Sequence, residues 1–198
     1  MVGRPQKRTQ ETRDNIIKIA EKLFDKSSFD HTSVEEIANK AQIAKATIFA
    51  HFGDKTNLLI AIKIKKLSTL IKTQSKENYH NEALLPHEIL LEYYKPWLKI
   101  FRENPDFAHL YLMQSTLKGG KWTDEFVAIC CKFEQLIQTR VEALIEEQRV
   151  TKLDDPYIST QALQAFYFHV LALYKGGYMK DQQQQEDLLA SLIYSWFK

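Results

Sequence analysis

Apolar residues recur along this sequence at the spacing of an α-helix, and no segment shows the regular alternation of a strand. The clearest stripe predicts a first helix over about residues 10–27 and comprises Ile16, Ile17, Ala20, Leu23 and Phe24. Further helical segments are expected at about 33–40, 44–50, 54–75, 86–103, 105–117, 122–149, 157–175 and 182–197. The pattern therefore predicts an all-α fold of about nine helices.

Polar caps and prolines mark the ends of these helices. Ser33 begins the capping-box sequence Ser-Val-Glu-Glu. Asn104-Pro105 and Asp155-Pro156 each place a capping side chain before a proline at the first helical position. Pro96 falls inside the 86–103 segment and should kink or split it, because proline removes a donor and clashes with the preceding turn.

Charge is unevenly divided along the chain. Residues 1–76 carry 15 Lys and Arg against 8 Asp and Glu, whereas residues 77–198 carry 12 against 17. This asymmetry indicates that the N-terminal part meets a polyanion, although a solvated basic face would give the same composition. We expect a DNA-binding domain over 1–55, a second domain over 56–198, and a connecting helix over 54–75. The polar stretch 74–81 resembles a linker.

Composition excludes several other classes. No run of about 18 apolar residues could span a membrane, and the polar N-terminus is unlike a secretory signal, so a cytoplasmic protein is expected. Cys130 and Cys131 are adjacent, which suits neither a disulfide framework nor a metal site. Cys130 lies on the apolar stripe of the 122–149 segment, so a structural thiol is expected and a redox sensor is the alternative, and Cys131 is turned about 100° away from that stripe. No cofactor or metal is predicted. The sequence has no glycine-rich phosphate loop or nucleophile elbow, and an enzyme is the alternative that these absences disfavour.

The segment 33–59, SVEEIANKAQIAKATIFAHFGDKTNLL, predicts two short helices joined by a tight turn. It resembles the helix-turn-helix of the TetR family of transcriptional regulators. The positions that match the family pattern are Ser33, Ile37, Ala38, Ala41, Ile43, Thr47, Ile48, Phe49, His51, Phe52, Lys55, Leu58 and Leu59. The resemblance is strong over about residues 10–60, and it extends to the rest of the chain only in the number and length of helices.

This motif predicts the DNA-binding residues. The second helix would lie in the major groove, where Lys45 can donate to guanine, and Ala46 and Phe49 can contact a thymine methyl. The resemblance implies phosphate contacts for Ser33, Thr47, His51 and Lys55. A basic arm of Arg4, Lys7 and Arg8 before the first helix would add backbone contacts.

Three residues depart from the family pattern. Gln42 replaces the usual glycine of the turn, and a positive φ there would cost about 1 kcal/mol. Ala44 replaces a capping serine, at a similar cost. Phe49 replaces a common tyrosine and loses a hydroxyl that could bond a phosphate.

Aromatic residues concentrate in the C-terminal part. The predicted ligand-binding residues are Tyr94, Trp97, Phe101, Tyr111, Phe126 and Phe133. For any single one of them, an ordinary core position is the alternative. The resemblance implies that this domain encloses a small inducer, which such a lining predicts to be apolar or aromatic.

The last two helices carry apolar stripes wide enough to pack against both their own domain and a partner, although a single intramolecular contact would give the same pattern. The resemblance implies a homodimer formed by these helices. The predicted interface residues are Phe166, His169, Leu188, Leu192 and Trp196. A two-fold dimer would match a palindromic operator on double-stranded DNA. The sequence thus predicts a ligand-responsive transcriptional regulator, with repression as the expected direction on resemblance.

Overall fold

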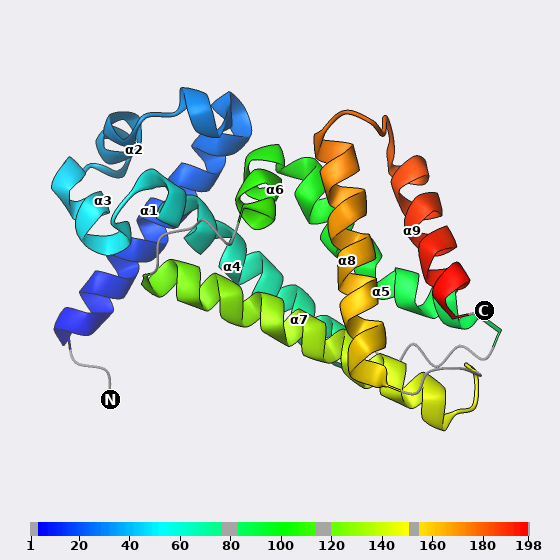
Figure 1. The fold of residues 1–198 in the computed structure, drawn as a ribbon. Coiled ribbons are helices and arrows are strands. Elements are labelled where there is room, and N and C mark those ends of the chain that lie inside the picture. Colours follow the sequence, from blue (N-terminus) through cyan, green and yellow to red (C-terminus); the bar gives the residue numbers. More distant parts are fainter. Residues whose placement is uncertain (1–3, 77–82, 114–119, 151–154, 198) are drawn as a thin grey trace. The chain divides into compact units, whose positions relative to one another are not determined.

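The computed structural model describes residues 4–76, 83–113, 120–150 and 155–197, with side chains from residue 7 onward. Within these ranges it contains nine α-helices and no strand, which confirms the predicted all-α fold (Figure 1). The helices are α1 (Arg4–His31), α2 (Val34–Ala41), α3 (Lys45–Phe52), α4 (Lys55–Gln74), α5 (Pro86–Glu103), α6 (Pro105–Leu112), α7 (Lys121–Glu146), α8 (Pro156–Lys175) and α9 (Gln182–Trp196). None of the described helices is apolar over a length that could cross a lipid bilayer.

The described residues divide into two compact units. The first comprises the described residues of 1–67 and 118–126, and the second those of 68–117 and 127–198. The chain passes between the units within α4 and within α7. The first unit therefore includes the N-terminal turns of α7, which the sequence analysis placed with the second domain.

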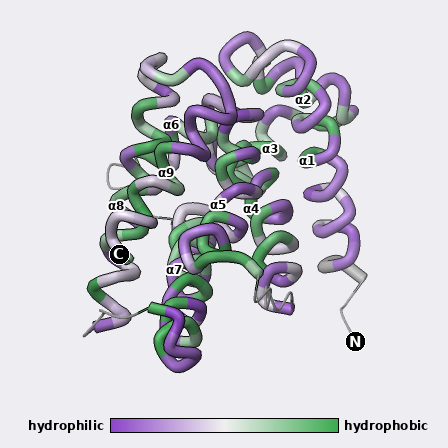
Figure 2. The backbone as a smooth tube through the Cα atoms, turned by 90° about the vertical axis from the view of Figure 1, so that its right-hand side faces the viewer, coloured by the Kyte–Doolittle hydropathy of each residue, from purple (hydrophilic) through white to green (hydrophobic). Residues whose placement is uncertain are grey.

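The first unit is built on α1. Its residues Ile16, Ala20 and Leu23 are buried, as the stripe predicted, and α2 packs against α1 while α3 packs against α2. The helix begins at Arg4, so the expected arm before it is wrong: Lys7 and Arg8 lie in its first turns. Polar residues at 6–15 leave no apolar periodicity by which a helix could be detected there from sequence, and Figure 2 shows that part of α1 as hydrophilic.

The turn between α2 and α3 has the geometry that its sequence suggested. Ser33 is the N-cap of α2, and its side-chain oxygen accepts from the backbone N–H of Glu36 at 3.0 Å. Gln42 adopts the left-handed conformation with φ 55°, and Ala44 makes no side-chain cap bond at the start of α3. Asp54 accepts from the backbone N–H of Asn57 at 2.6 Å and so caps α4.

The second unit packs α5 against α6, α8 and α9, and α6 against α8. The helices α8 and α9 lie side by side (Figure 1). Arg102 joins α5 to α9 through two largely buried contacts. Its guanidinium donates a hydrogen bond to Gln185 at 2.8 Å and lies 3.6 Å from the Glu186 carboxylate. The expected split of α5 at Pro96 does not occur: the helix is continuous from Pro86 to Glu103.

The C-terminal end of α4 corrects the expected linker. Gln74 is the last residue of α4 and is only 1% exposed. Residues 77–82 of the expected linker lie outside the described part of the chain. In the sequence, Gln74 is followed by Ser, Lys and Glu, which suggests an exposed segment. Its burial depends instead on hydrogen-bond partners in α5.

Candidate nucleic-acid interface and ligand site

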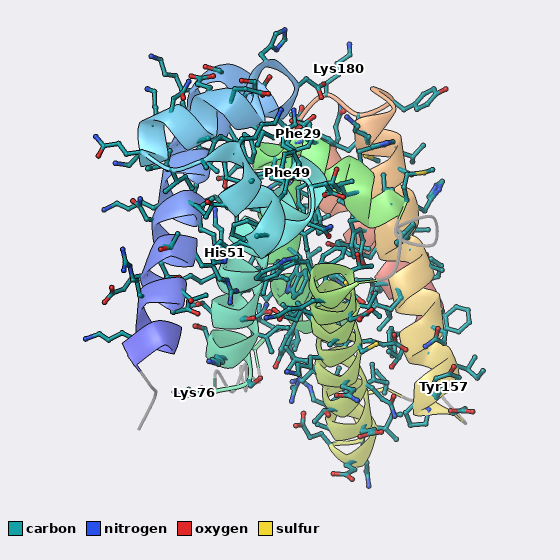
Figure 3. All side chains as sticks on the ribbon, turned by 90° about the vertical axis from the view of Figure 1, so that its left-hand side faces the viewer. Phe29, Phe49, His51, Lys76, Tyr157 and Lys180 are labelled. Carbon is teal, nitrogen blue, oxygen red and sulfur yellow. The ribbon has the colours of Figure 1, made fainter. Side chains whose placement is uncertain are left out.

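The exposed face of α3 carries the residues expected to read bases. Lys45, Ala46, Phe49 and Ala50 are exposed, while the residues Ile48 and Phe52 are buried. The Phe49 ring is 41% exposed. Figure 3 labels Phe49 and His51 on this helix. The arrangement leaves one face of α3 open along its length.

An open cleft of about 920 Å³ lies between α1 and α3. Its lining residues are Lys7, Arg8, Thr9, Glu11, Thr12, Thr47 and His51. The cleft thus brings together two predicted basic residues from α1 and two predicted phosphate contacts from α3. Two cationic side chains beside hydroxyl and imidazole donors make a surface suited to an anionic backbone. The Arg4 side chain, also predicted to bind DNA, lies outside the described residues.

Lys45 is not free to reach a base in this arrangement. Its ammonium forms an exposed ion pair with the Glu35 carboxylate of α2, and it lies 5.7 Å from the Phe49 ring centroid. The hydrogen bond from Lys45 lowers the pKa of the Glu35 carboxyl below its ordinary value. Exposed ion pairs are weak, so a guanine acceptor can compete with Glu35 for this ammonium.

Lys55 turns inward. Its ammonium donates to the backbone carbonyls of Phe29 at 2.8 Å and Thr32 at 3.1 Å, and it lies 4.2 Å from the Phe29 ring centroid. These contacts give Lys55 a structural role at the end of α1.

Ser33, the other predicted phosphate contact at a helix start, is exposed. Its side-chain oxygen is the acceptor in the cap of α2, so its hydroxyl proton remains available as a donor.

Trp122 is a residue of this unit that sequence reasoning missed. Its ring stacks on Phe52 with centroids 5.5 Å apart, the Arg13 guanidinium lies 4.3 Å from its centroid, and its indole N–H donates to the His51 carbonyl at 3.3 Å. Trp122 therefore holds the C-terminal turn of α3 against α1. The sequence signal was a large aromatic residue two positions after the Gly119-Gly120 break, but nothing in the spacing indicated its partner.

The second unit contains an aromatic cluster that holds five of the six predicted ligand-binding residues. Tyr94, Trp97, Phe101, Tyr111 and Phe133 are each at most 5% exposed. The Trp97 and Phe133 rings stack at 4.0 Å, and Phe101 lies 4.7 Å from Tyr111. The sixth residue, Phe126, is buried but belongs to the first unit. Tyr167 of α8 joins the cluster 5.0 Å from Tyr94, and its sequence context does not distinguish it from its aromatic neighbours.

The polar atoms of this cluster are held in their neutral forms. Burial raises the pKa of Tyr94, Tyr111 and Tyr167 well above the ordinary value, and a nearby Glu134 carboxylate adds to the effect at Tyr94. Burial also raises the pKa of the Cys130 thiol to about 12, with a smaller contribution from Cys131. A protonated, largely buried thiol is a poor nucleophile, which agrees with the structural role expected for Cys130. Cys131 is exposed, as its helical position predicted.

Gln74 links α4 to the cluster. The Trp97 indole N–H donates to the Gln74 side-chain oxygen at 3.0 Å, and the Gln74 amide donates to the Tyr93 backbone carbonyl at 2.8 Å. The oxygen and the nitrogen of the buried Gln74 side chain therefore both have hydrogen-bond partners in α5. Sequence reasoning missed this residue because its polarity and position resemble those of a linker.

The predicted dimer residues lie on a partly exposed face of α8 and α9. Leu188, Leu192 and Phe166 are half-buried, His169 is exposed, and Trp196 is 39% exposed. The Phe166 and Trp196 rings are 5.9 Å apart, which joins the two helices in one apolar surface. Across the described residues no cluster of three or more His, Cys, Asp or Glu side chains has the arrangement of a metal site.

Comparisons with known proteins agree with the helix-turn-helix. The family model described as bacterial regulatory proteins, tetR family, matches residues 16–62. An HTH-type transcriptional regulator of Staphylococcus aureus is 35% identical over 74 residues, which is 36% of this chain and 40% of that protein. The chain thus matches less than half the length of this curated relative.

Solved structures resemble the whole fold. The transcriptional regulator FadR from Bacillus subtilis, in complex with stearoyl-CoA, has a TM-score of 0.67 at 14% identity and covers 93% of this chain and 97% of its own. The TetR family regulator PfmR from Thermus thermophilus has a TM-score of 0.60 at 21% identity, covering 92% and 96%. At these identities the likeness shows the fold alone.

The described part of the chain is all-α and contains a helix-turn-helix unit of the kind found in DNA-binding regulators. Over residues 16–62 the chain is similar to the TetR family of bacterial regulatory proteins. The curated relatives that match this part of the chain are HTH-type transcriptional regulators.

Proposed function

We propose that the chain is a ligand-responsive transcriptional regulator, a repressor that a small apolar or aromatic inducer releases from a palindromic operator. The observation that carries the DNA-binding part is the cleft between α1 and α3, where Lys7 and Arg8 face Thr47 and His51. In this proposal these four side chains grip the phosphate backbone, while Ala46 and Phe49 contact base edges in the major groove. As a regulator of chromosomal DNA it acts in the cytoplasm.

Dimerisation follows from the apolar surface of α8 and α9. In the proposal, Leu188, Leu192 and Trp196 meet the same surface of a second copy, because a two-fold pair gives each copy an identical, self-complementary patch. A groove on α8 lined by Gln161, Gln164, Ala165, Phe168, His169 and Ala172 adds to the available surface. Two recognition helices related by this axis would read two half-sites of one operator.

Inducer binding is assigned to the aromatic cluster of the second unit. Its connection to the DNA-binding unit runs through α4, which begins at Lys55 in the first unit and ends at Gln74 beside Trp97 in the second. An inducer that rearranges Trp97 would therefore change the hydrogen bonds that hold the end of α4. Such a change regulates DNA binding only if the inducer has different affinities for the two arrangements.

Selection of DNA fragments from a random library by the purified chain tests this function. The expected product is a palindromic sequence bound with a Kd on the order of 10⁻⁸–10⁻¹¹ M at physiological salt. Lys7→Ala and Arg8→Ala should weaken binding to all sequences equally and each reduce the salt slope by about one per subunit. Lys72→Ala, on the exposed face of α4, is the matched control. Failure to enrich any sequence would contradict the proposal.

A further inference from the structure

Two tyrosine hydroxyls in the core of the second unit have no hydrogen-bond partner. Tyr94 of α5 and Tyr167 of α8 are both 0% exposed, and their rings lie 5.0 Å apart. Neither hydroxyl makes a hydrogen bond within the described residues. A buried hydroxyl without a partner costs about 1–3 kcal/mol, and the great majority of buried polar groups are satisfied. Two adjacent exceptions therefore need a physical reason.

The surroundings of these hydroxyls are aromatic and uncharged on most sides. Phe133 lies 5.3 Å from Tyr94 and 6.0 Å from Tyr167, and Tyr111 lies 6.1 Å from Tyr167. The charge of Glu134 acts on Tyr94, and the Glu134 carboxylate already accepts a hydrogen bond from Gln161. The hydroxyls can thus both donate and accept, in a site whose walls are flat rings.

A cavity next to this cluster provides room for a ring. It has a volume of about 280 Å³, and its lining includes Phe101, Ala108 and Leu171. These positions adjoin the cluster, since Tyr111 follows Ala108 by three residues and Tyr167 precedes Leu171 by four, so each pair shares a helix face. Lys175 and Lys180 lie at its solvent-exposed end.

We propose that Tyr94 and Tyr167 are the polar anchor of the inducer site, and that the inducer is a small neutral aromatic molecule carrying a hydroxyl or carbonyl oxygen. This inference rests on the proposed function, because it names the ligand class for the same site. An oxygen on the ligand completes the hydrogen bonding of both tyrosines, and its ring packs in the adjoining cavity against Phe101, as aromatic rings do in protein cores.

Charged ligands fit this site poorly. An anion would lose its hydration among aromatic side chains and would face the Glu134 carboxylate. A cation would have to compete with Gln161 for that carboxylate and would leave the tyrosine hydroxyls to act as acceptors only. A neutral oxygen-bearing ring avoids both costs, and it uses the donor and acceptor capacity of the phenols together.

An ordinary structural role for these tyrosines makes the opposite prediction about stability. If Tyr167 has no partner, Tyr167→Phe removes an unsatisfied group, and the melting temperature of the protein alone should stay constant or rise. If the hydroxyl is a satisfied part of the core, the same substitution should lower the melting temperature by several degrees. The sign of the change separates the two cases without any ligand.

Calorimetric titration of the full chain without DNA tests the ligand class. Phenol is the neutral probe, toluene is its counterpart without the oxygen, and benzoate and benzylamine are the charged probes. Phenol should bind the wild-type chain at least ten-fold more tightly than toluene, and neither charged probe should bind comparably. In the Tyr94→Phe, Tyr167→Phe double variant the preference for phenol over toluene should fall below two-fold. Tyr178→Phe, at a position that is 81% exposed, should keep the preference.

A steric variant provides a second measurement. Ala108→Leu adds volume at the wall of the cavity and should abolish phenol binding while the tyrosines remain. Equal binding of phenol and toluene to the wild type, no binding of phenol, stronger binding of a charged probe, or an unchanged preference in the double variant would each overturn the proposal. Because no DNA is present, a chain that binds phenol in this way but selects no operator would refute the proposed function and leave the ligand class standing.

Discussion

Lys55 shows how one side chain can serve the fold at a position where resemblance implies DNA contact. Two of its three N–H donors are directed at the Phe29 and Thr32 carbonyls, just after Ser28 leaves the helical conformation with φ 62°. The Phe29 carbonyl also accepts from the Thr32 backbone N–H at 3.3 Å, and the ammonium adds a second donor at this end of α1. One N–H remains for a phosphate oxygen.

Lys55→Ala should therefore lower the free energy of unfolding by about 2 kcal/mol, since hydrogen bonds to a charged group contribute about 1.5–3 kcal/mol. Urea denaturation followed by circular dichroism measures this loss. Lys72→Ala, an exposed lysine of the same helix, is the control and should change stability little. An unaltered unfolding midpoint in Lys55→Ala, together with a flatter salt dependence of DNA binding, would show that Lys55 acts on DNA alone.

Sequence reasoning located exposed residues better than it identified partners. The open face of α3 followed from helical periodicity, which also placed Cys131 outward. The ion pair of Lys45 with Glu35 and the contacts of Trp122 join residues 10 and 71 positions apart. No local pattern encodes such pairs, because they depend on how helices pack and not on their periodicity.

At the scale of elements, the turn between α2 and α3 contains two unfavourable residues. Gln42 holds φ 55°, which favours glycine, and Ala44 cannot cap α3. Gln42→Gly and Ala44→Ser should each raise the free energy of unfolding by about 1 kcal/mol. Equilibrium denaturation of the two single variants and the double variant checks this, and a loss of stability in either single variant would contradict this account of the turn.

The attachment of α4 to α5 makes a second prediction at this scale. Gln74→Met keeps the length of the side chain but removes both hydrogen bonds, which leaves the Trp97 indole N–H and the Tyr93 carbonyl without that partner. We expect a loss of about 2 kcal/mol. Trp97→Phe removes the same indole donor, so a double-mutant cycle between the two substitutions should give a coupling energy of about 1 kcal/mol. Strictly additive losses would show that the bond contributes nothing.

Helix positions were largely predictable because prolines and capping residues mark the helix ends in the sequence. Pro86, Pro105, Pro156 and Asp181 begin helices at or next to the expected positions. The start of α1 and the burial of Gln74 were not predictable from the sequence. The polar residues 6–15 show no apolar periodicity that would indicate a helix. The burial of Gln74 depends on its hydrogen bonds to α5. The placement of 118–126 with the first unit likewise depends on Trp122 and its partners.

For the whole molecule, the separation of charge nearly follows the separation into units. The basic stretch 1–76 supplies most of the first unit, and the acidic remainder supplies most of the second. Under the proposed function this division directs the first unit to DNA and keeps the second from competing for it. The proposed palindromic operator requires in addition that two first units be held at a fixed spacing, and α8 and α9 offer a surface for such an assembly.

Leu192→Asp tests that assembly. Leu192 is half-buried between Leu188 and Trp196 on α9, so an aspartate there would place an unpaired charge in the proposed apolar interface. Light scattering should give a dimer for the wild-type chain and a monomer for the variant at micromolar concentration. Gln182→Glu adds the same charge at an exposed position of α9 and should remain dimeric.

The variant must also be shown to fold, which its circular dichroism spectrum and melting curve report. A folded Leu192→Asp monomer should bind a palindromic operator with the weak affinity of one half-site, because each recognition unit then binds alone and the gain in effective concentration from the partner is lost. A wild-type chain that is monomeric at micromolar concentration, or a Leu192→Asp variant that stays dimeric, would refute the α8–α9 interface. The operator would then have to be read by a different arrangement of the first units.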